Sequence, residues 1–162
     1  MPPNITLEID WIHGYCGDQN GLSYIEDDNV AYQAAAVGVC YKAEGHSQRF
    51  FDKHESRVSC IAYHPDKRTV ATGQAAPKAV VLIWDAITMK QLVRVTSKNL
   101  VKGIAAVAFS PSGKLLAITD ASDDANVIVV DTKTGAEVAK SRKAAGNIAF
   151  EDESTFVTVC AK

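Results

Sequence analysis

The chain has 162 residues, of which 47% are hydrophobic, and a formal net charge of −2 at pH 7. These values are typical of one soluble domain with enough apolar side chains for a core. The nearly balanced charge gives no strong attraction to nucleic acid or to an anionic membrane surface, and no apolar run approaches the roughly 20 residues that span a bilayer. We therefore expect neither nucleic acid nor a membrane as a partner.

The N-terminus and the cysteines indicate the compartment. The first ten residues, MPPNITLEID, lack the basic start and the apolar middle of a secretory signal peptide. Cys16, Cys40, Cys60 and Cys160 lie far apart and form no CxxC pair. This spacing favours reduced thiols over a disulfide framework or a zinc site. Together these features predict a cytoplasmic protein.

Short β-type runs separated by turns follow one another along the chain. Residues 5–11 alternate apolar and polar side chains, as in a half-buried strand. Further runs rich in Val, Ile and aromatic residues are, in chain order, LSYI, NVAYQA, VGVCY, RFF, RVSCIAY, TVAT, VVLIW, QLVRV, IAAVAF, KLLAIT, NVIVV, EVAKS, NIAF and TFVTVC. The turn sequences HPDK, SPSG, SDDAN and DTKTG separate many of them. The pattern predicts an all-β chain, with the segment GHSQRF (45–50) as a surface loop.

An internal repeat relates RVSCIAYHPDKRTVAT to KGIAAVAFSPSGKLLAIT. Aligning Val58 with Ile104 gives a shift of 46 residues (104 minus 58), and the same shift places VVLIWD on NVIVVD. A third, partial copy begins at GNIAF. A period in the forties with four short strands per unit is typical of a β-propeller blade, and blades bury their faces by packing around a common axis. We predict a WD-repeat β-propeller with about three and a half blades of four-stranded antiparallel sheets.

The repeat divides the chain into five predicted parts. They are a leading strand and loop (1–21), an atypical first blade (22–53), a WD-repeat blade (54–97), a degenerate WD-repeat blade (98–143) and a partial blade (144–162). Seven blades of about 40 residues would need roughly 300 residues. The expectation is a fragment of a longer protein, or a split propeller whose remaining blades come from another chain.

The dipeptide Trp84-Asp85 ends a predicted third strand, as in the WD-repeat pattern. In that pattern a His at the start of the blade and a Ser or Thr on its second strand share a buried hydrogen-bond network with the Trp. The reason is that a buried indole N–H and a buried hydroxyl both need partners. His54 and Thr72 stand at these positions, whereas Lys78 replaces the Asp that usually precedes the Trp by six residues.

The next repeat keeps the complementary part of the pattern. Asp124 is present six residues before Val130, which replaces the Trp, while Leu100 replaces the His and Asp131 matches Asp85. Both networks are incomplete. We therefore predict irregular blades in which these residues serve cohesion and not catalysis.

The N-terminal run LEIDWIHGYCGDQNGLSYIEDDNVAYQAAAVGVCY resembles the hydrophobic motif of the echinoderm microtubule-associated protein-like family. Trp11, Gly14 and Tyr15 carry the W-x-x-G-Y element of that motif. The blocks KHESRVSCIAYHPDKRTVATGQ and VVLIWDAITM resemble the atypical WD repeats that follow it in the family. The resemblance extends over residues 5–143.

Three departures from the family pattern are visible. The loop 16–20 is short and lacks the family's basic residues. Lys53 precedes His54 where the family usually has Gly, and no coiled coil or basic Ser-rich region precedes the motif.

The resemblance implies a function as well as a fold. Family members resemble tandem propellers, with the hydrophobic motif buried where two propellers pack together. It implies a non-enzymatic scaffold that binds tubulin or microtubules through its β-propeller, in the cytoplasm and on the cytoskeleton, with a ciliary or flagellar role as a variant. The alternative hypothesis is a general WD-repeat adaptor for protein–protein interaction without tubulin affinity, since fold does not fix function.

Catalytic and metal-binding motifs are not expected. His13, His46, His54 and His64 have no H-x-x-x-H or H-x-H spacing, and the sequence contains no G-x-S-x-G element. The Gly-Lys in SPSGKLL lacks the spaced glycines and the following helix of a phosphate loop. An enzyme using the central channel would need converging carboxylates or histidines, yet the predicted innermost strands carry small apolar residues. We expect no cofactor, no metal and no catalytic residue.

A set of basic side chains remains as a candidate partner contact. Its members are Lys90, Arg94, Lys98, Lys102, Lys140, Arg142 and Lys143. They could face an acidic partner such as tubulin. The favoured interpretation is that they are solvated charges that discourage pairing between sheet edges.

Overall fold

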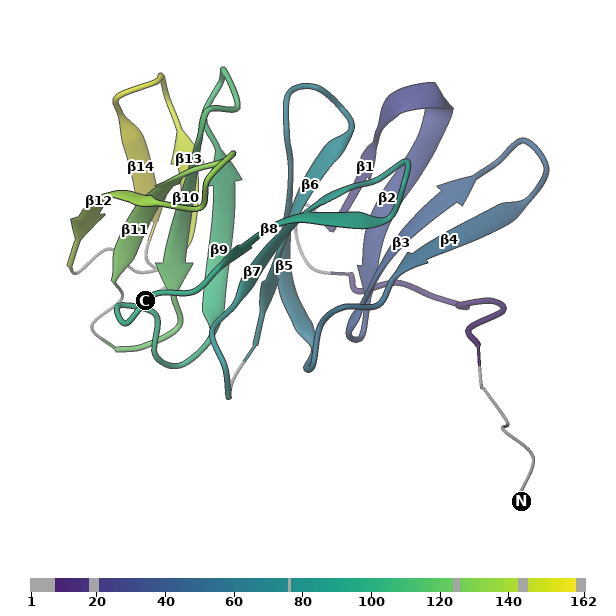
Figure 1. Ribbon diagram of the computed structural model, residues 1–162, viewed down its shortest axis with the longest axis horizontal. Coiled ribbons are helices and arrows are strands. Elements are labelled where there is room, and N and C mark those ends of the chain that lie inside the picture. Colours follow the sequence, from purple (N-terminus) through teal and green to yellow (C-terminus); the bar gives the residue numbers. More distant parts are fainter. Residues whose placement is uncertain (1–7, 18–20, 76, 124–125, 143–145, 160–162) are drawn as a thin grey trace.

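The computed structural model describes residues 8–17, 21–75, 77–123, 126–142 and 146–159. Within them the chain forms three four-stranded antiparallel sheets and one two-stranded sheet (Figure 1). The strands are, sheet by sheet, β1 (Leu22–Tyr24), β2 (Asn29–Ala34), β3 (Val37–Lys42) and β4 (Ser47–Phe51); β5 (Val58–Tyr63), β6 (Thr69–Gln74), β7 (Val81–Asp85) and β8 (Lys90–Val95); β9 (Ile104–Phe109), β10 (Leu115–Asp120), β11 (Val127–Asp131) and β12 (Glu137–Ser141); β13 (Asn147–Phe150) and β14 (Phe156–Val159). A short 3-10 helix, η1 (Glu26–Asp28), joins β1 to β2.

Strands in each sheet follow chain order, so every sheet is a meander of hairpins. The sheets stand side by side (Figure 1). Strand β9 packs between β5 and β13, the first strands of their sheets, whereas the first sheet meets β5 through its second strand, β2. The predicted all-β architecture, a WD-type β-propeller of about three and a half blades, is confirmed. In the described part of the chain, no helix has the length and apolarity required to cross a membrane.

Two local expectations are wrong. Residues 8–11, the described part of the strand expected over residues 5–11, form no strand. Residues 45–50, expected to be a surface loop, are mostly strand. Strand β4 begins at Ser47 and pairs with β3 through to Phe51, which lies opposite Gly38. The turn is confined to the preceding residues, where Gly45 and His46 have positive φ values of 83° and 47°. The strand extends into this segment because Phe51 is fully buried and anchors it in the core.

Three apolar clusters lie between successive sheets and hold them together. The first joins sheets one and two and contains Ile25, Ala31, Cys40, Phe51, Ile61, Val70, Val80, Leu82, Trp84 and Ala86. The second joins sheets two and three and contains Ala71, Val81, Ile83, Val95, Leu100, Ile104, Val107, Leu116, Ile118, Ile128 and Val130. The third joins sheet three to the two-stranded sheet and contains Ala106, Ala117, Val127, Val129 and Ile148. Burial between blades is therefore the main source of cohesion.

Strand β6 shows how one strand serves two of these clusters. Because side chains alternate across a strand, Val70 faces the first sheet while Ala71 faces the third. Gly73 lies on the same side as Ala71, and a Cβ built there would be 2.5 Å from Cys60 Sγ and 2.6 Å from Ile104 Cγ2. A glycine at this position is therefore what allows the third sheet to pack so closely.

Candidate functional site

The buried polar network of the second sheet connects three elements. Trp84 Nε1 on β7 donates a hydrogen bond to Thr72 Oγ1 on β6 at 3.1 Å, and Thr72 Oγ1 is 2.7 Å from His54 Nε2 in the segment before β5. All three side chains are buried. The sequence-predicted residues His54, Thr72 and Trp84 thus meet at one point.

Gln74 completes this network, and sequence reasoning missed it. Its Oε1 lies 3.2 Å from His54 Nδ1 and accepts a hydrogen bond from the Glu55 N–H, while its Nε2 donates to the Lys78 carbonyl oxygen. The amide oxygen of Gln74 is thus the acceptor for His54 Nδ1, a role that the WD pattern gives to an Asp at position 78. The signal was available, because Thr72 and Gln74 are two residues apart on one strand and share a face.

These contacts define the protonation of His54. Since Gln74 Oε1 can only accept, His54 Nδ1 carries the proton, and Nε2 accepts from the Thr72 hydroxyl. The Thr72 hydroxyl in turn accepts from Trp84. In the neutral state each of these atoms is therefore satisfied. Burial lowers the pKa of His54; the hydrogen bond to Gln74 opposes this effect, and nearby Arg94 adds to it.

We expect a specific pH dependence of stability from His54. Its folded-state pKa lies below the ordinary value of 6.5, so the unfolded chain binds the proton more readily. The free energy of unfolding should be highest above pH 6.5 and should fall as the pH drops from 6.5 toward the folded-state pKa. Urea unfolding at pH 7.5, 6.5 and 5.5 measures this loss.

A matched pair of substitutions assigns the loss to His54. H54Q should be less stable at pH 7.5 but should lose less stability between pH 7.5 and 5.5 than the native chain. H13Q, at an exposed histidine, should keep the native pH dependence. An H54Q variant with the full native pH dependence would contradict the assignment.

Trp84 also anchors the contact between the first and second sheets. Its indole stacks on Phe51 of β4, with ring centroids 4.6 Å apart and an interplanar angle of 4°. A Cβ at Gly38 on β3 would be 2.6 Å from Trp84 Cζ2, so the indole lies directly on the backbone of β3 at that glycine. Packing of the indole therefore links the first and second sheets, and its N–H ties β7 to β6 within the second sheet.

In the third sheet the corresponding positions are apolar. Leu100 and Val130, in place of the His and the Trp, are buried in the cluster between sheets two and three. Asp120 lies 46 residues after Gln74 (120 minus 74), and its Oδ1 accepts hydrogen bonds at 3.1 Å from two successive backbone N–H groups, those of Val101 and Lys102. Asp124, predicted to belong to this network, lies outside the described residues.

Asp85 and Asp131 do not join the Trp84 network; both organise hairpin turns. Asp85 Oδ1 accepts from the N–H groups of Ile87 and Thr88, and Asp131 Oδ1 accepts from those of Lys133 and Thr134, again at a shift of 46 residues (131 minus 85). This role explains why the repeat keeps an Asp as the last residue of the third strand even where it lacks the Trp.

Asp85 also pairs with Arg68, whose Nε lies 2.8 Å from its Oδ2. Burial would raise the pKa of Asp85, but the Thr88 N–H, the Arg68 guanidinium and the Ile87 N–H outweigh burial and hold that pKa below its usual range. The carboxylate is therefore charged at neutral pH and tied to its turn.

The hydrophobic motif lies against the first sheet. Trp11 is half-buried, with its ring centroid 4.7 Å from that of His46 and 6.3 Å from that of Tyr41. Gln48 of β4 holds the backbone of Ile12 by accepting from its N–H at 2.8 Å and donating to its carbonyl at 3.0 Å.

The other two motif residues differ from Trp11. Gly14 has a φ of 101°, a conformation that favours glycine, and Tyr15 is 63% exposed. In this motif Trp11 therefore packs on the first sheet, Gly14 forms a turn, and the side chain of Tyr15 is exposed to solvent.

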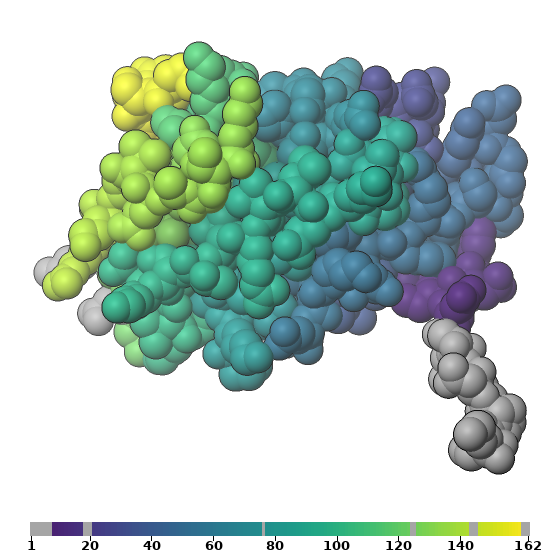
Figure 2. All heavy atoms as spheres, viewed as in Figure 1, coloured from purple at the N-terminus to yellow at the C-terminus, as the bar shows by residue number. Residues whose placement is uncertain are grey.

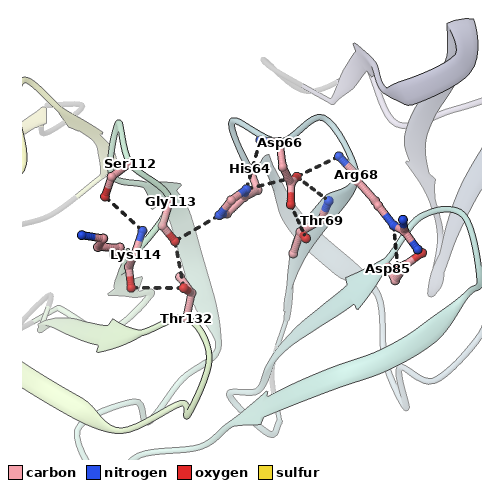
Figure 3. A network of polar contacts seen from close by, with 9 residues as sticks. All are labelled: His64, Asp66, Arg68, Thr69, Asp85, Ser112, Gly113, Lys114 and Thr132. Carbon is pink, nitrogen blue, oxygen red and sulfur yellow. Dashed lines mark hydrogen bonds and ion pairs between the residues drawn. The ribbon is translucent and has the colours of Figure 1, made fainter.

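The turns between first and second strands form a second polar network, at one end of the sheets. The Glu26 N–H donates to the Lys67 carbonyl between sheets one and two. His64 Nε2 contacts the Gly113 carbonyl at 3.1 Å between sheets two and three (Figure 3). Between sheet three and the two-stranded sheet, the Glu153 carboxylate accepts hydrogen bonds from the backbone N–H and the hydroxyl of Ser112.

The predicted basic residues are dispersed over the surface. Lys90 and Arg94 are exposed on β8, Lys98 is exposed in the following loop, and Lys140 and Arg142 are at the end of β12. Lys102 pairs with Asp123 at 3.0 Å, and Lys143 lies outside the described residues. Most of these side chains lie on or beside the outer strands β8 and β12, which appear on the face shown in Figure 2.

Other candidate chemistry can be stated only for the described residues. Among them, no group of three or more His, Cys, Asp or Glu side chains is placed to hold a metal ion. Burial raises the pKa of the Cys40 and Cys60 thiols to about 12, which keeps them protonated. These two thiols therefore behave as core side chains.

Comparison with known proteins agrees with this geometry. The family model for the WD domain, G-beta repeat, matches residues 45–85 and 91–131, which together make up half of the chain. The chain belongs to the WD-repeat family. The matched ranges of this WD-repeat chain end at Asp85 and Asp131, the two residues that organise equivalent turns.

Curated relatives of the WD-repeat chain share a family name. It is 33% identical over 134 residues to echinoderm microtubule-associated protein-like 1 of Mus musculus, covering 75% of this chain and 16% of that protein. It is 32% identical to echinoderm microtubule-associated protein-like 3 of Mus musculus over 158 residues. It is also 32% identical to echinoderm microtubule-associated protein-like 2 of Rattus norvegicus over 152 residues, and each match covers 86% of this chain. These two matches cover 18% and 23% of the relatives. The resemblance predicted from the sequence is confirmed, and the WD-repeat chain spans about a fifth of the length of these relatives.

Proposed function

We propose that this WD-repeat chain is a microtubule-associated scaffold without enzymatic activity, acting in the cytoplasm on the cytoskeleton. The observation that supports this proposal is the 32–33% identity to proteins named as microtubule-associated over 75–86% of the chain. The similarity extends over most of the chain and is not confined to one repeat. It therefore favours this function over that of a general WD-repeat adaptor.

The arrangement of polar groups is consistent with a scaffold. The polar groups of the buried His54, Thr72 and Gln74 are committed to one another, to Trp84 or to nearby backbone groups, which leaves them no part in chemistry on a substrate. Such networks specify packing when they are fully satisfied. We assign them a structural role, and we propose that binding uses the outer surface of the blades.

For the binding surface we propose the exposed basic side chains of the outer strands. Lys90 and Arg94 on β8, with Lys140 and Arg142 at the end of β12, present four positive charges on the outer side of the second and third sheets. Attraction between such a surface and an acidic partner such as tubulin raises the association rate and weakens with salt. A role in cilia or flagella is a variant of this proposal.

Co-sedimentation with stabilised microtubules tests the function. The protein should appear in the pellet in a saturable manner at low salt, and less of it should do so as salt is raised. The double variant K140E/R142E should reduce the bound fraction several-fold, since it reverses two charges of the proposed surface. Near-UV circular dichroism checks that the variant is folded.

A control separates the surface from net charge. K42E, at an exposed lysine of the first sheet, reverses a charge elsewhere and should leave binding close to that of the native protein. Absence of the protein from the pellet at low salt would count against microtubule association and in favour of the adaptor alternative. Binding that is equally sensitive to K42E and K140E/R142E would reject the proposed surface.

A further inference from the structure

A groove between the second and third sheets lies outside the binding surface proposed above. It has a volume of about 530 Å³, and its floor is apolar, formed by Ile83 of β7 with Leu92 and Val93 of β8. Leu92 is 55% exposed although it belongs to this floor. Lys114 and Lys133, from two turns of the third sheet, line the groove with positive charge.

The wall of the groove is fixed in place by the contacts in Figure 3. His64 from the second sheet reaches across to the Gly113 carbonyl, which also accepts a hydrogen bond from Thr132 Oγ1 at 2.8 Å. Gly113 has a φ of 76°, and a Cβ there would be 1.9 Å from His64 Nε2, so only a glycine allows this approach. Because the two sheets are tied at this point, the groove is formed before any ligand arrives.

The two lysines have charge available for a partner. Neither Lys114 nor Lys133 makes an ion pair with another residue that the structure describes. Lys133 interacts electrostatically with Asp131, and Lys114 does so with Glu153. Both carboxylates already accept hydrogen bonds: that of Asp131 from its own turn, and that of Glu153 from Ser112.

Asp66 also lines the groove, but its carboxylate is used locally. One oxygen accepts from the N–H groups of Arg68 and Thr69, and the other accepts from the Thr69 hydroxyl (Figure 3). These hydrogen bonds outweigh burial and keep the pKa of Asp66 below its usual range. Asp66 therefore stays charged but is held in its own turn and beside His64, and the groove presents an apolar floor next to two lysines that form no ion pair with another described residue.

We propose that this groove binds an extended segment of a partner protein in which aliphatic side chains alternate with Asp or Glu. An aliphatic side chain of the segment packs on Leu92 and Val93 and removes their surface from water. Carboxylates on either side of it pair with the exposed ammonium groups of Lys114 and Lys133 at the rim of the groove. Pockets of this size typically bury most of a small ligand, which suits a short linear segment.

A labelled peptide tests the proposal directly. The probe is a fluorescein-labelled peptide of sequence GDELDLEDG, followed by fluorescence anisotropy with the native protein. Binding should be saturable, and replacing both leucines of the peptide by serine should weaken it about tenfold or more. The protein variant K114E/K133E should weaken binding by a similar factor, and L92S should do so through the floor of the groove.

The control variant is K42E, which reverses an exposed charge on the first sheet, outside the groove, and should leave peptide binding unchanged. Three results would overturn the proposal: no saturable binding of the leucine peptide, equal binding of the serine peptide, or full binding by K114E/K133E. Equal binding of the serine peptide would show that the attraction is only electrostatic.

A second measurement uses the native protein and does not depend on any variant being folded. A peptide carrying photo-leucine in place of its second leucine should cross-link, after irradiation, to residues 83–93, 112–114 or 132–133. Cross-links confined to other parts of the chain would reject the groove. Both experiments are performed without microtubules, so their outcome is separate from that of the co-sedimentation assay.

Discussion

Replacing Trp84 by Ala is expected to lower the free energy of unfolding by about 3–5 kcal/mol, the range for truncating a large buried aromatic side chain. Trp84 is completely buried, stacks on Phe51 and donates its N–H to Thr72. The truncation would leave a cavity between the first two sheets and remove the hydrogen-bond donor from the centre of the network. Both effects act at the contact between the first and second sheets, so the packing of these two blades against each other should weaken.

Urea unfolding followed by far-UV circular dichroism measures this change. W84F serves as the comparison, because a phenyl ring keeps part of the stack on Phe51 but cannot donate to Thr72. W84F should therefore fall between the native protein and W84A. A W84A variant within about 1 kcal/mol of the native protein would contradict the anchoring role, since truncation of a buried Trp costs several times more.

The substitution G38A should destabilise the protein by about 1–3 kcal/mol, the range for overpacking a core. A methyl group at Gly38 would be 2.6 Å from Trp84 Cζ2, well inside the contact distance. Trp84 cannot move away easily, because Phe51 stacks on it. The strain should therefore be borne by the packing of β3 against β7.

A double-mutant cycle makes this prediction specific. In the W84F background G38A should cost clearly less, since the phenyl ring lacks the atoms of the second indole ring, and the two substitutions should be non-additive. G17A is the control: a Cβ at Gly17 meets no atom within 4 Å, so the substitution should have little effect. Additive effects of G38A and W84F would show that the strain arises elsewhere.

The sequence indicated the strands because the repeat and the alternation of apolar residues are local properties. The 46-residue shift paired Val58 with Ile104, and these residues begin β5 and β9. The prediction fails at residues 45–50, where the pattern after Gly45 and His46 does not fit a WD-repeat strand, although pairing with β3 and the burial of Phe51 make a strand. Tertiary pairing overrode local composition there.

The buried network was predictable only in part. His54, Thr72 and Trp84 stand at positions that the WD pattern specifies. Gln74 shares a strand face with Thr72 but is not among those positions, because the pattern expects a carboxylate at position 78. The stacking of Phe51 on Trp84 depends on how two sheets are oriented, which no local spacing encodes. The blade boundaries and the roles of the basic residues stay predictions.

The turns between the first and second strands of neighbouring sheets contact one another, and these contacts limit how the repeats of such a chain can be rearranged. Neighbouring sheets always meet at this end, yet each junction uses a different chemistry: two backbone groups for Glu26 and Lys67, an imidazole at His64, and a carboxylate at Glu153. Repeats that look equivalent in an alignment are therefore not exchangeable. A shuffled or duplicated repeat would bring a different donor to its new neighbour, so these junctions depend on the order of the repeats as well as on their sequence.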